Sequence, residues 1–472
     1  MLNYTSQDQL QNMFQAHFTN KWAAGQSTIK FRLSLLKKLE AALLADRVLI
    51  QEALHQDLRK VSLETDLTEL YVVLTELRHC IKHLSRWMED DHPRTPLTLL
   101  GTRGFVRKES KGVVLVISPS NFPLNLSLNP LIHALAAGNC VVLKPSERTP
   151  ATAQYLENIC SKIFAQELVS VVQGDSSISE ILLKLPFNHI HFTGGTNIGK
   201  IVMHAAAENL ASVTLELGGK SPAVVDQTAN LKHAAERIAW ARFFNSGQTC
   251  IAVDYVLVEA KVYDAFLKEL KKSIIQLYGN APYEDNPDYA RLAHQDAFQK
   301  QKALLADALS KGAEIAVGGE MSAEQKFVAP TVLLNVNEGM RVLQEEIFGP
   351  LLPVVIVKNL DEAIEFIQKR PTPLSLYHYS TSKRAQKKLI AHTRAGTGGI
   401  NESVIQFFHP GLPFGGMGTS GIGRSSGKTG FLSFCNHRSI IRKSAYKDVI
   451  GLALPPFTGI KKRIASILIK WF

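Results

Sequence analysis

The sequence contains only five cysteines in 472 residues, and they form neither a C-x-x-C pair nor a zinc-ligand spacing. A sparse, odd set of thiols is typical of a reducing compartment, where free cysteines mostly pack as small, inert hydrophobic side chains. The cysteines therefore predict no disulfide framework, and the sequence predicts no metal site. Cys250 is the exception, because it lies in a small polar turn instead of an apolar run.

Long apolar runs are also lacking. No window reaches the roughly 18 apolar residues that a membrane-spanning helix needs. Residues 1–20 are polar and do not contain the apolar stretch of a secretion signal. We expect a soluble protein of the cytoplasm that is not exported.

Acidic residues are outnumbered, and the formal net charge is +11. Most of the excess lies at one end, because eight basic residues from Arg438 onward face the single acid Asp448. The rest of the chain carries about +4 and needs no anionic partner. Since basic and aromatic residues are not interleaved and no zinc-finger pattern is present, we do not expect nucleic-acid binding.

The pattern of apolar residues predicts an α/β protein. With 45% apolar residues the chain can bury a large core, and its length suggests two or three domains. Amphipathic stretches at 29–50 and 67–88 predict packing helices. Short apolar runs then alternate with helical stretches, which favours a parallel sheet covered on both faces. These runs are 113–117, 140–143, 169–172, 189–192, 213–217 and 223–225.

The alternation restarts after Gly218 and predicts a second α/β domain. Its first elements are a helix at 231–244, a strand at 255–259 and a helix at 262–278, and similar units continue to about Ile400. Residues 413–430 are rich in glycine and predict a loop.

Two turns are candidate cofactor contacts. In open α/β sheets a glycine-rich turn between a strand and a helix lets a pyrophosphate approach the helix N-terminus. Gly194, Gly195 and Gly199 lie in such a place, although a plain turn explains them equally well. Lys144 and Glu147 follow another strand and could hold ribose hydroxyls, or they could form a solvated loop.

Cys250 and Glu216 are the candidate reactive groups. The turn that carries Cys250 follows a helix and precedes a strand, a junction that can expose a thiol to a cleft. Glu216 lies in the apolar run 213–217. A carboxylate there either pairs with a cation, for which Lys220 is the nearest candidate, or has its pKa raised towards that of a general base. The residues alone leave both interpretations open.

Taken together, seven segments resemble the aldehyde dehydrogenase superfamily, and the resemblance runs from about Lys111 to about Ile441. Their shared order makes coincidence a poor explanation. They are SPSNFP at 118–123, KPSE at 144–147, FTGG at 192–195, LELGGK at 215–220, GQTC at 247–250, EEIFGP at 345–350 and PFGG at 413–416. QTCIA at 248–252, GLPFGG at 411–416 and HRS at 437–439 are similar to the class 3, fatty-aldehyde-type branch.

The resemblance implies a fold with a Rossmann-type cofactor domain and a second α/β catalytic domain. It places an N-terminal helical segment and the dinucleotide-binding domain at 1–217, the catalytic domain at 218–410, a return to the cofactor domain with an oligomerisation region at 411–440, and a basic tail at 441–472. The branch is usually dimeric, uses NAD or NADP and accepts aliphatic and aromatic aldehydes, so a homodimer and an apolar aldehyde are implied here.

The resemblance also implies a role for each site residue. Cys250 would attack the aldehyde, Asn121 would stabilise the oxyanion and Glu216 would activate the water that hydrolyses the thioester. The other implied residues hold the cofactor: Lys144, Glu147, Gly194, Gly195, Gly199, Glu346 and Phe348.

Two positions depart from the family pattern, because Ser120 stands where tryptophan is common and Gly195 where many members have serine. Both fall in the expected cofactor region. The two rival functions are an acylating dehydrogenase that passes the thioester to coenzyme A and a catalytically silent member of the superfamily. The first typically lacks the glutamate matched by Glu216, and the second would have lost the cysteine or the glutamate.

The C-terminal residues 459–472 predict a basic amphipathic helix too short to span a membrane. Ile460, Ile464, Ile467, Leu468 and Trp471 fall at helical spacing, and the basic residues fall largely on the rest of the surface. Such a helix could pack against the body or a partner subunit, cover the substrate entrance, or contact a membrane surface.

Overall fold

The computed structural model describes residues 6–99, 101–281, 283–443 and 454–471. Helices form the N-terminal part, as predicted, but the stretch expected as one helix at 29–50 is broken at Asp46, whose backbone leaves the helical conformation. The elements are α1 (Gln7–Gly25), α2 (Ile29–Ala45), α3 (Arg47–Leu58), α4 (Ser62–Thr65), the π-helix η1 (Asp66–Leu70) and α5 (Tyr71–Met88).

A six-stranded sheet follows, in the order β16-β6-β5-β2-β3-β4. Its strands β2 to β6 are parallel, and β16 adds to the edge antiparallel to β6. The strands are β2 (Val113–Ile117), β3 (Cys140–Lys144), β4 (Val169–Val171), β5 (His189–Gly194), β6 (Ser212–Leu217) and β16 (Gly421–Ile422). The connecting helices are α6 (Asn125–Ala136), α7 (Pro150–Ile163), α8 (Ser176–Leu183) and α9 (Thr196–Glu208).

The second sheet has seven strands in the order β15-β14-β7-β8-β13-β12-β9. All its neighbours are parallel except β9, which is antiparallel to β12. The strands are β7 (Pro222–Val225), β8 (Tyr255–Glu259), β9 (Glu314–Val317), β12 (Thr331–Leu334), β13 (Leu351–Val357), β14 (Ser375–Tyr379) and β15 (Thr397–Ile400). The run 223–225 therefore belongs to this sheet, although its pattern continued that of the first sheet.

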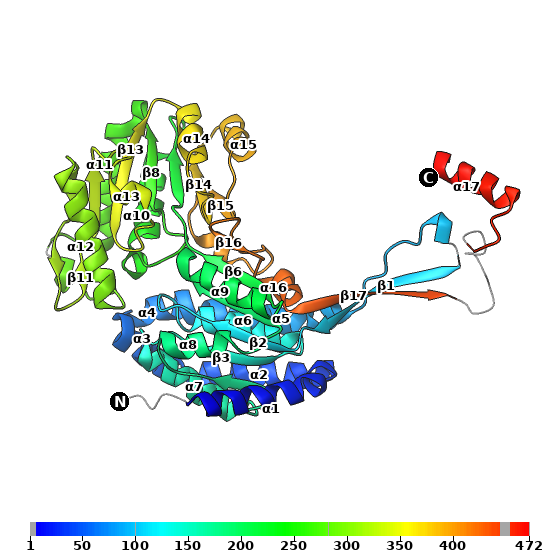
Figure 1. Ribbon diagram of the computed structural model, residues 1–472. Helices are drawn as coiled ribbons and strands as arrows, with labels where there is room; N and C mark the ends of the chain where they lie inside the picture. The colour runs from blue at the N-terminus through cyan, green and yellow to red at the C-terminus, as the bar shows by residue number, and fades with distance from the viewer. Residues whose placement is uncertain (1–5, 100, 282, 444–453, 472) are drawn as a thin grey trace.

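Helices cover the second sheet as well, and Figure 1 shows the two sheets in separate layers. The helices are α10 (Leu231–Phe243), α11 (Tyr263–Tyr278), α12 (Gln295–Ser310), α13 (Arg341–Gln344), α14 (Leu360–Gln368) and α15 (Lys383–His392), and two short strands, β10 (Met321–Ser322) and β11 (Phe327–Val328), form a hairpin. Two largely parallel sheets flanked by helices confirm the predicted α/β class.

The N-terminal helices share one hydrophobic core with the first sheet. Leu36 of α2, Leu77 of α5 and Val114 of β2 are fully buried in this cluster. Side chains of the second sheet form further clusters of their own. The helices that precede β1 are therefore a structural part of the layer that carries β2 to β6.

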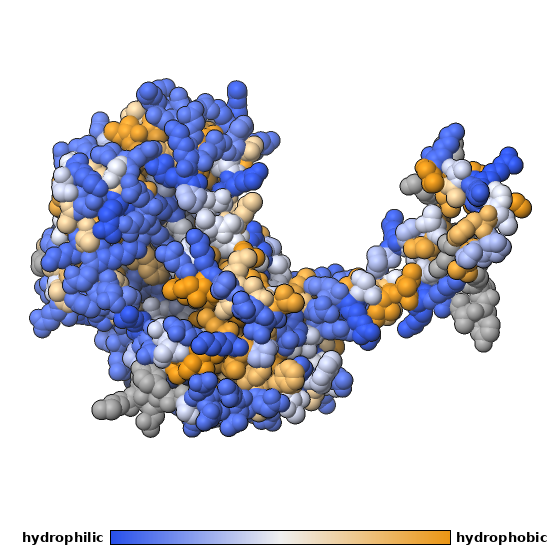
Figure 2. All heavy atoms as spheres, in the orientation of Figure 1, coloured by the Kyte–Doolittle hydropathy of each residue, from blue (hydrophilic) through white to orange (hydrophobic). Residues whose placement is uncertain are grey.

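A two-stranded ribbon leaves the body and carries the C-terminal helix at its end (Figure 1). It pairs β1 (Thr102–Ser110) with β17 (Cys435–Lys443) along their whole length and follows the short helix α16 (Gly427–Ser433). We call this ribbon and α17 (Gly459–Trp471) the arm. Figure 2 shows the arm standing clear of the body. Residues 444–453 and 472 of the predicted tail lie outside the described residues.

Candidate active site

Two hollows meet at Cys250 and Glu216. The first, which we call the strand-end cleft, is lined by residues that follow β2, β3 and β5, together with Glu346 and Phe348. The second, which we call the apolar cavity, is lined mainly by aromatic and aliphatic side chains. Both are bordered by Cys250, Glu216, Thr193 and Leu126. A thiol and a carboxyl group therefore stand where the two spaces join.

The strand-end cleft lies at the carboxyl ends of parallel strands. Ser120 and Asn121 follow β2, and Glu147 follows β3. Gly194 ends β5 and Gly195 follows it. Strand ends of this kind are where open α/β sheets bind nucleotides.

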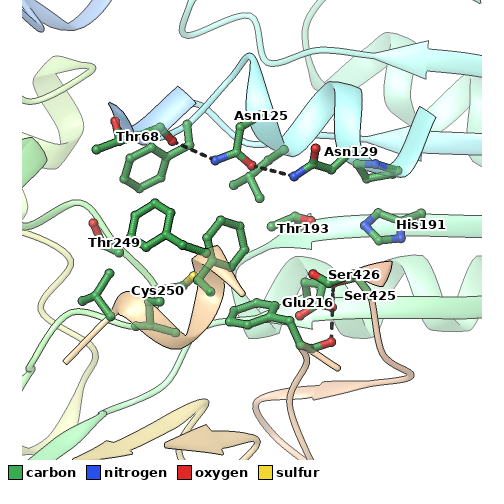
Figure 3. A pocket seen from close by; sticks show the side chains of 18 of the residues that line it. Thr68, Asn125, Asn129, His191, Thr193, Glu216, Thr249, Cys250, Ser425 and Ser426 are labelled. Carbon is green, nitrogen blue, oxygen red and sulfur yellow. Dashed lines mark hydrogen bonds between the residues drawn. The ribbon is translucent and has the colours of Figure 1, made fainter. Parts of the chain in front are cut away.

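The apolar cavity lies on the other side of Cys250. Its apolar lining consists of Phe122, Leu126, Pro130, Phe244, Ile251, Val404, Phe407, Phe408, Phe414 and Phe434. Figure 3 shows aromatic rings around Cys250, with Asn125 and Asn129 of α6 on one side and Glu216 and Ser425 on the other. A largely aromatic lining with a few polar groups is suited to an apolar molecule that carries one reactive polar group.

Cys250 is carried by a strained loop. Asn245 and Ser246 both have left-handed backbones, with φ of 50° and 53°, and Gly247 follows with φ of 75°. A Cβ at Gly247 would lie 2.3 Å from the carbonyl oxygen of Gly349, so this position requires glycine. Non-glycine residues in this region cost about 1–3 kcal/mol each and persist only where their surroundings hold them.

Hydrogen bonds to neighbouring elements keep the loop in this conformation. The Gln248 amide donates to the carbonyls of Asn245 (3.1 Å) and Arg291 (3.0 Å) and accepts the N–H of Ala293 at 2.9 Å. The backbone N–H of Asn245 donates to Glu64 of α4 at 2.9 Å. The loop is therefore attached both to the N-terminal helices and to the segment before α12.

The Cys250 thiol is half-buried. Burial, with the nearby carboxyls of Glu346 and Glu216, raises its pKa above the ordinary value, while the N–H groups of Cys250 and Ile251 lie against the sulfur and act in the opposite direction. The thiol is therefore protonated at neutral pH in this environment, and attack by its sulfur requires loss of the proton.

Asn121 reaches the Cys250 loop from the other layer. Its side-chain amide donates to the Gln248 carbonyl at 2.9 Å. An amide nitrogen carries two hydrogens, so Asn121 has a second one to offer to a molecule between the two hollows. The Asn245 amide in turn donates to the Asn121 carbonyl at 2.9 Å.

Glu216 lies within a regular strand. β6 pairs it with Thr193 of β5 on one side and with Gly421 of β16 on the other. Burial raises the pKa of Glu216 to about 8, although Ser425 donates to its Oε1 at 2.8 Å and acts against this. The other oxygen, Oε2, is buried and has no partner within the described part of the chain.

The ion pair between Glu216 and Lys220 that the residues also allowed is wrong. Lys220 instead forms an ion pair with Asp254 and donates to the carbonyls of Val342 (2.8 Å) and Glu345 (2.9 Å). The raised pKa of Glu216 agrees with the other interpretation, in which this carboxyl has the pKa of a general base.

Glu346 faces the strand-end cleft beside Gly218 and Gly219. The N–H of Gly219 donates to its carboxylate, and burial raises its pKa to about 7. A Cβ at Gly218 would lie 2.0 Å from Glu346 Oε2, so glycine is needed for this approach. Glu346 Oε1 has no partner within the described part of the chain, which leaves an acceptor for hydroxyl groups in the cleft.

The structure places the remaining predicted residues as follows. Glu147 and Phe348 line the cleft, and Lys144 is buried, not solvated, with its ammonium 3.4 Å from Glu147. Gly194 lines the cleft above the Phe192 ring. Gly199 lies one turn into α9 against Leu217, where a Cβ would come within 2.5 Å of that side chain. Its contact is therefore with β6.

The two departures from the family pattern both line the cleft. Ser120 lies in the turn after β2. Gly195 is the N-cap of α9, and a Cβ there would meet nothing within 4 Å. There is therefore room for a serine side chain at position 195, and the structure does not require glycine there.

Sequence reasoning missed several residues around the site. Ser425 lies in the segment interpreted only as a glycine-rich loop, although that segment also contains β16 and begins α16. Lys60 and Glu69 lie among helices that were assigned to packing. A fully buried lysine and glutamate are unusual without partners, but sequence alone does not show burial.

Comparison with known proteins identifies the class of protein that this fold and site define. The model of the aldehyde dehydrogenase family matches residues 3–440. The chain is 41% identical to the 4,4'-diaponeurosporen-aldehyde dehydrogenase of Staphylococcus aureus over 93% of this chain and 94% of that protein. It is also 41% identical to human aldehyde dehydrogenase family 3 member B1, over 93% and 92% of the two chains.

A solved structure agrees. The substrate-bound state of Staphylococcus aureus AldH superposes with a TM-score of 0.93 at 39% identity, covering 97% of this chain and 99% of that one. The chain belongs to the aldehyde dehydrogenase family, and its similar relatives include members of family 3. It is an oxidoreductase that oxidises aldehydes with NAD or NADP, the cofactors present in similar solved structures.

Proposed function

We propose that this enzyme converts an apolar aldehyde to the carboxylic acid through a thioester on Cys250. The observation that carries the proposal is the meeting of the two hollows at Cys250 and Glu216. One hollow has the location and polar edges of a nucleotide site, and the other has the lining of an apolar substrate site. The reacting carbon would lie where they join.

The chain's own groups account for every step except acceptance of the hydride. The Cys250 thiol first gives up its proton to water in the cleft, and its sulfur then attacks the carbonyl carbon. The oxygen that becomes negative is held by the Asn121 amide and the N–H of Cys250. NAD or NADP, when bound in the strand-end cleft, would supply the acceptor for the hydride of this carbon, and the carbon would then be held on Cys250 as a thioester. Glu216 then takes a proton from water, the water oxygen attacks the thioester, and the acid leaves as the thiol is restored.

The residues at the strand-end cleft fit the cofactor. Glu346 Oε1 is a buried acceptor without a partner, and Gly218 leaves the space that its carboxylate occupies. We assign the nicotinamide ribose to Glu346, with Phe348 beside it, and the adenosine ribose to Lys144 and Glu147. Gly194 and Gly195 would face the pyrophosphate at the N-terminus of α9, and Gly199 would hold that helix on the sheet.

Replacing the base tests the second half of the mechanism. Glu216→Gln should reduce about one cofactor per active site in a burst and then stall, because only hydrolysis of the thioester needs the base. Stopped-flow absorbance at 340 nm, followed by mass spectrometry of the intact protein, measures the burst and the acylated Cys250. Steady turnover at the parental rate in this variant would remove Glu216 from its role.

The apolar cavity supports an apolar substrate of extended length. A further hollow, lined by Leu63, Leu67, Tyr71 and Trp240, shares Thr68, Phe244 and Phe408 with the cavity. Each buried methylene contributes about 0.8 kcal/mol, or about fourfold in kcat/KM. A panel of linear aldehydes measured with NAD and with NADP should show kcat/KM rising until the cavity is filled. A flat response, equal to that of hydroxylated aldehydes of matched length, contradicts this proposal.

A second copy of the chain would cover the arm. A two-stranded ribbon is marginally stable by itself, and most residues of β17 are exposed, including Ile441 at 60%. We therefore keep the homodimer as a proposal. Light scattering of the intact chain should give twice the monomer mass, and Ile441→Asp should lower that value, whereas Ser439→Asp on the same strand serves as the polar control. A parental mass of one chain contradicts the dimer.

The C-terminal helix is proposed to contact a membrane surface. Within the described residues no helix is long and apolar enough to cross a bilayer. α17 lies at the end of the arm, far from both sheets (Figure 1), and exposes Ile460, Ile467 and Ile469 beside Lys461 and Lys462. Co-sedimentation with phosphatidylserine vesicles should fall when the chain ends at Lys447, and equal binding rules out this role.

All five cysteines are free thiols, which supports a reducing compartment, the cytoplasm.

A further inference from the structure

A buried ion pair from the N-terminal helices lies behind the turn that carries Asn121. The Lys60 ammonium is 2.8 Å from Glu69 Oε1, and both side chains are fully buried. Burying two charges costs free energy that their mutual attraction often fails to recover, so such a pair is weak evidence of a stabilising role. The other contacts of Lys60 and Glu69 show which part of the chain the pair positions.

Lys60 contacts the peptide that follows Asn121. Its ammonium donates to the Asn121 carbonyl at 3.0 Å and lies 4.1 Å from the centre of the Phe122 ring. The same carbonyl accepts the Asn245 amide at 2.9 Å. A hydrogen bond from a buried cation is stronger than one from a neutral donor, so Lys60 is the firmer of these two attachments.

Glu69 contacts the end of the same turn. Its Oε2 accepts the N–H of Asn125 at 2.9 Å, and its carboxylate also accepts the N–H of Leu124. α6 begins at Asn125, and Leu124, its N-cap residue, offers no side-chain acceptor. Glu69 therefore caps α6 from a distant element, at the helix end where a negative charge is favoured.

Glu69 itself lies in the π-helix η1, a rare form found often at functional sites. The Asn125 amide donates to the carbonyl of Thr68 at 3.1 Å in the same element. Neither Lys60 nor Glu69 lines the cleft or the cavity, so neither contacts substrate or cofactor. The pair holds residues 121–125 at both ends.

We propose that Lys60 and Glu69 are positioning residues that set the place of the Asn121 amide relative to Cys250. This inference rests on the proposed role of Asn121 as an oxyanion donor. Loss of either charge lets residues 121–125 shift, and the Asn121 amide then stabilises the oxyanion less well. The effect falls on the first half of the reaction, whereas binding of the cofactor in the strand-end cleft is unchanged.

The test is a double-mutant cycle on the rate of the first turnover. Lys60→Met and Glu69→Gln should each slow the cofactor burst about tenfold or more, with the KM for NAD changed less than twofold. Acylation by 4-nitrophenyl acetate, which needs an oxyanion donor but no cofactor, should slow in parallel. Asn121→Ala alone should cost about 10²-fold, typical of a lost oxyanion donor. Adding Lys60→Met or Glu69→Gln to Asn121→Ala should then cost less than twofold.

Asp226→Asn is the matched control, because it breaks a buried pair with His378 (3.2 Å) at the far end of β7. Its effect should be the same with and without Asn121→Ala. Equal losses from Lys60→Met in both backgrounds would overturn the positioning role, as would parental burst rates in both Lys60→Met and Glu69→Gln. Glu69→Gln preserves volume and an acceptor for α6, so it covers the case in which Lys60→Met does not fold. If Asn121→Ala leaves the burst unchanged, the oxyanion role fails first and the positioning role falls with it.

Discussion

Glu216 and Cys250, the proposed base and nucleophile, both border the two hollows but are held in different ways. Glu216 belongs to a strand paired on both sides, so backbone hydrogen bonds fix it in place. Cys250 follows two non-glycine residues with left-handed backbones, and side chains from several elements keep that loop in shape. The position of Glu216 should therefore tolerate changes to its neighbours, whereas the position of Cys250 should respond to changes at some distance.

The largest effect is expected at the nucleophile itself. Cys250→Ala should lower aldehyde oxidation by about 10⁴-fold or more, because it removes the sulfur on which the proposed thioester forms. Binding of NAD, measured by fluorescence titration, should stay within twofold of the parental value. Cys435→Ala, which removes a buried thiol that is 4% exposed and lines neither hollow, is the control. Parental activity in Cys250→Ala would refute the assignment.

A change near each group tests the comparison directly. Asn245→Ala removes the donors to the carbonyls of Asn121 and Gln248 and leaves alanine in a left-handed backbone, so the burst should slow by about 10²-fold. Thr214→Ala, two residues from Glu216 in β6, should change it by less than twofold, because the strand pairing remains. Similar losses in the two variants would show that both groups depend on side chains.

The dependence of kcat on pH tests the ionisation of Glu216. Because the pKa of Glu216 is raised to about 8, most of it is protonated at pH 7 and unable to act as a base. Where hydrolysis limits turnover, kcat should rise by about tenfold from pH 7 to pH 9 and level off. Ser425→Ala removes a hydrogen bond that favours the ionised form, so the rise should move to higher pH. A profile that is unchanged in Ser425→Ala contradicts this account.

The smallest effect is expected at the edge of the cleft. Gly195→Ser adds a side chain into open space and supplies an N-cap hydroxyl to α9, which should stabilise the protein by a few tenths of a kcal/mol and lower the KM for NAD by up to about threefold. Thermal melting and steady-state kinetics measure the two effects. Gly247→Ala, in the crowded loop, should instead reduce both stability and turnover. A loss of cofactor affinity in Gly195→Ser would show that the cleft is less open than its geometry indicates.

Most of the regular structure could be predicted because its pattern is local. The runs at 113–117 and 255–259 match β2 and β8 to the residue, and the amphipathic stretch at 459–472 matches α17 within one residue. The periodicity of strands and helices depends on residues close together in the chain, so it can be recognised without knowledge of the fold. The break at Asp46 depends on packing, and the sequence did not indicate it. The apolar pattern by itself did not separate 223–225 from the first sheet either, although the domain boundary at 218 that the resemblance implied lies before this run.

The ordered segments around Cys250, Glu216 and Asn121 by themselves placed the chain in its family and pointed to the thiol, the carboxyl and the amide, because short motifs carry chemistry at fixed spacing. Only the tertiary structure decided that Lys220 pairs with Asp254 and that Ser425 reaches Glu216. It alone brought Lys60 and Glu69 behind Asn121. These contacts join residues that are distant in the chain. Which residues meet depends on burial and on how the separate layers pack together.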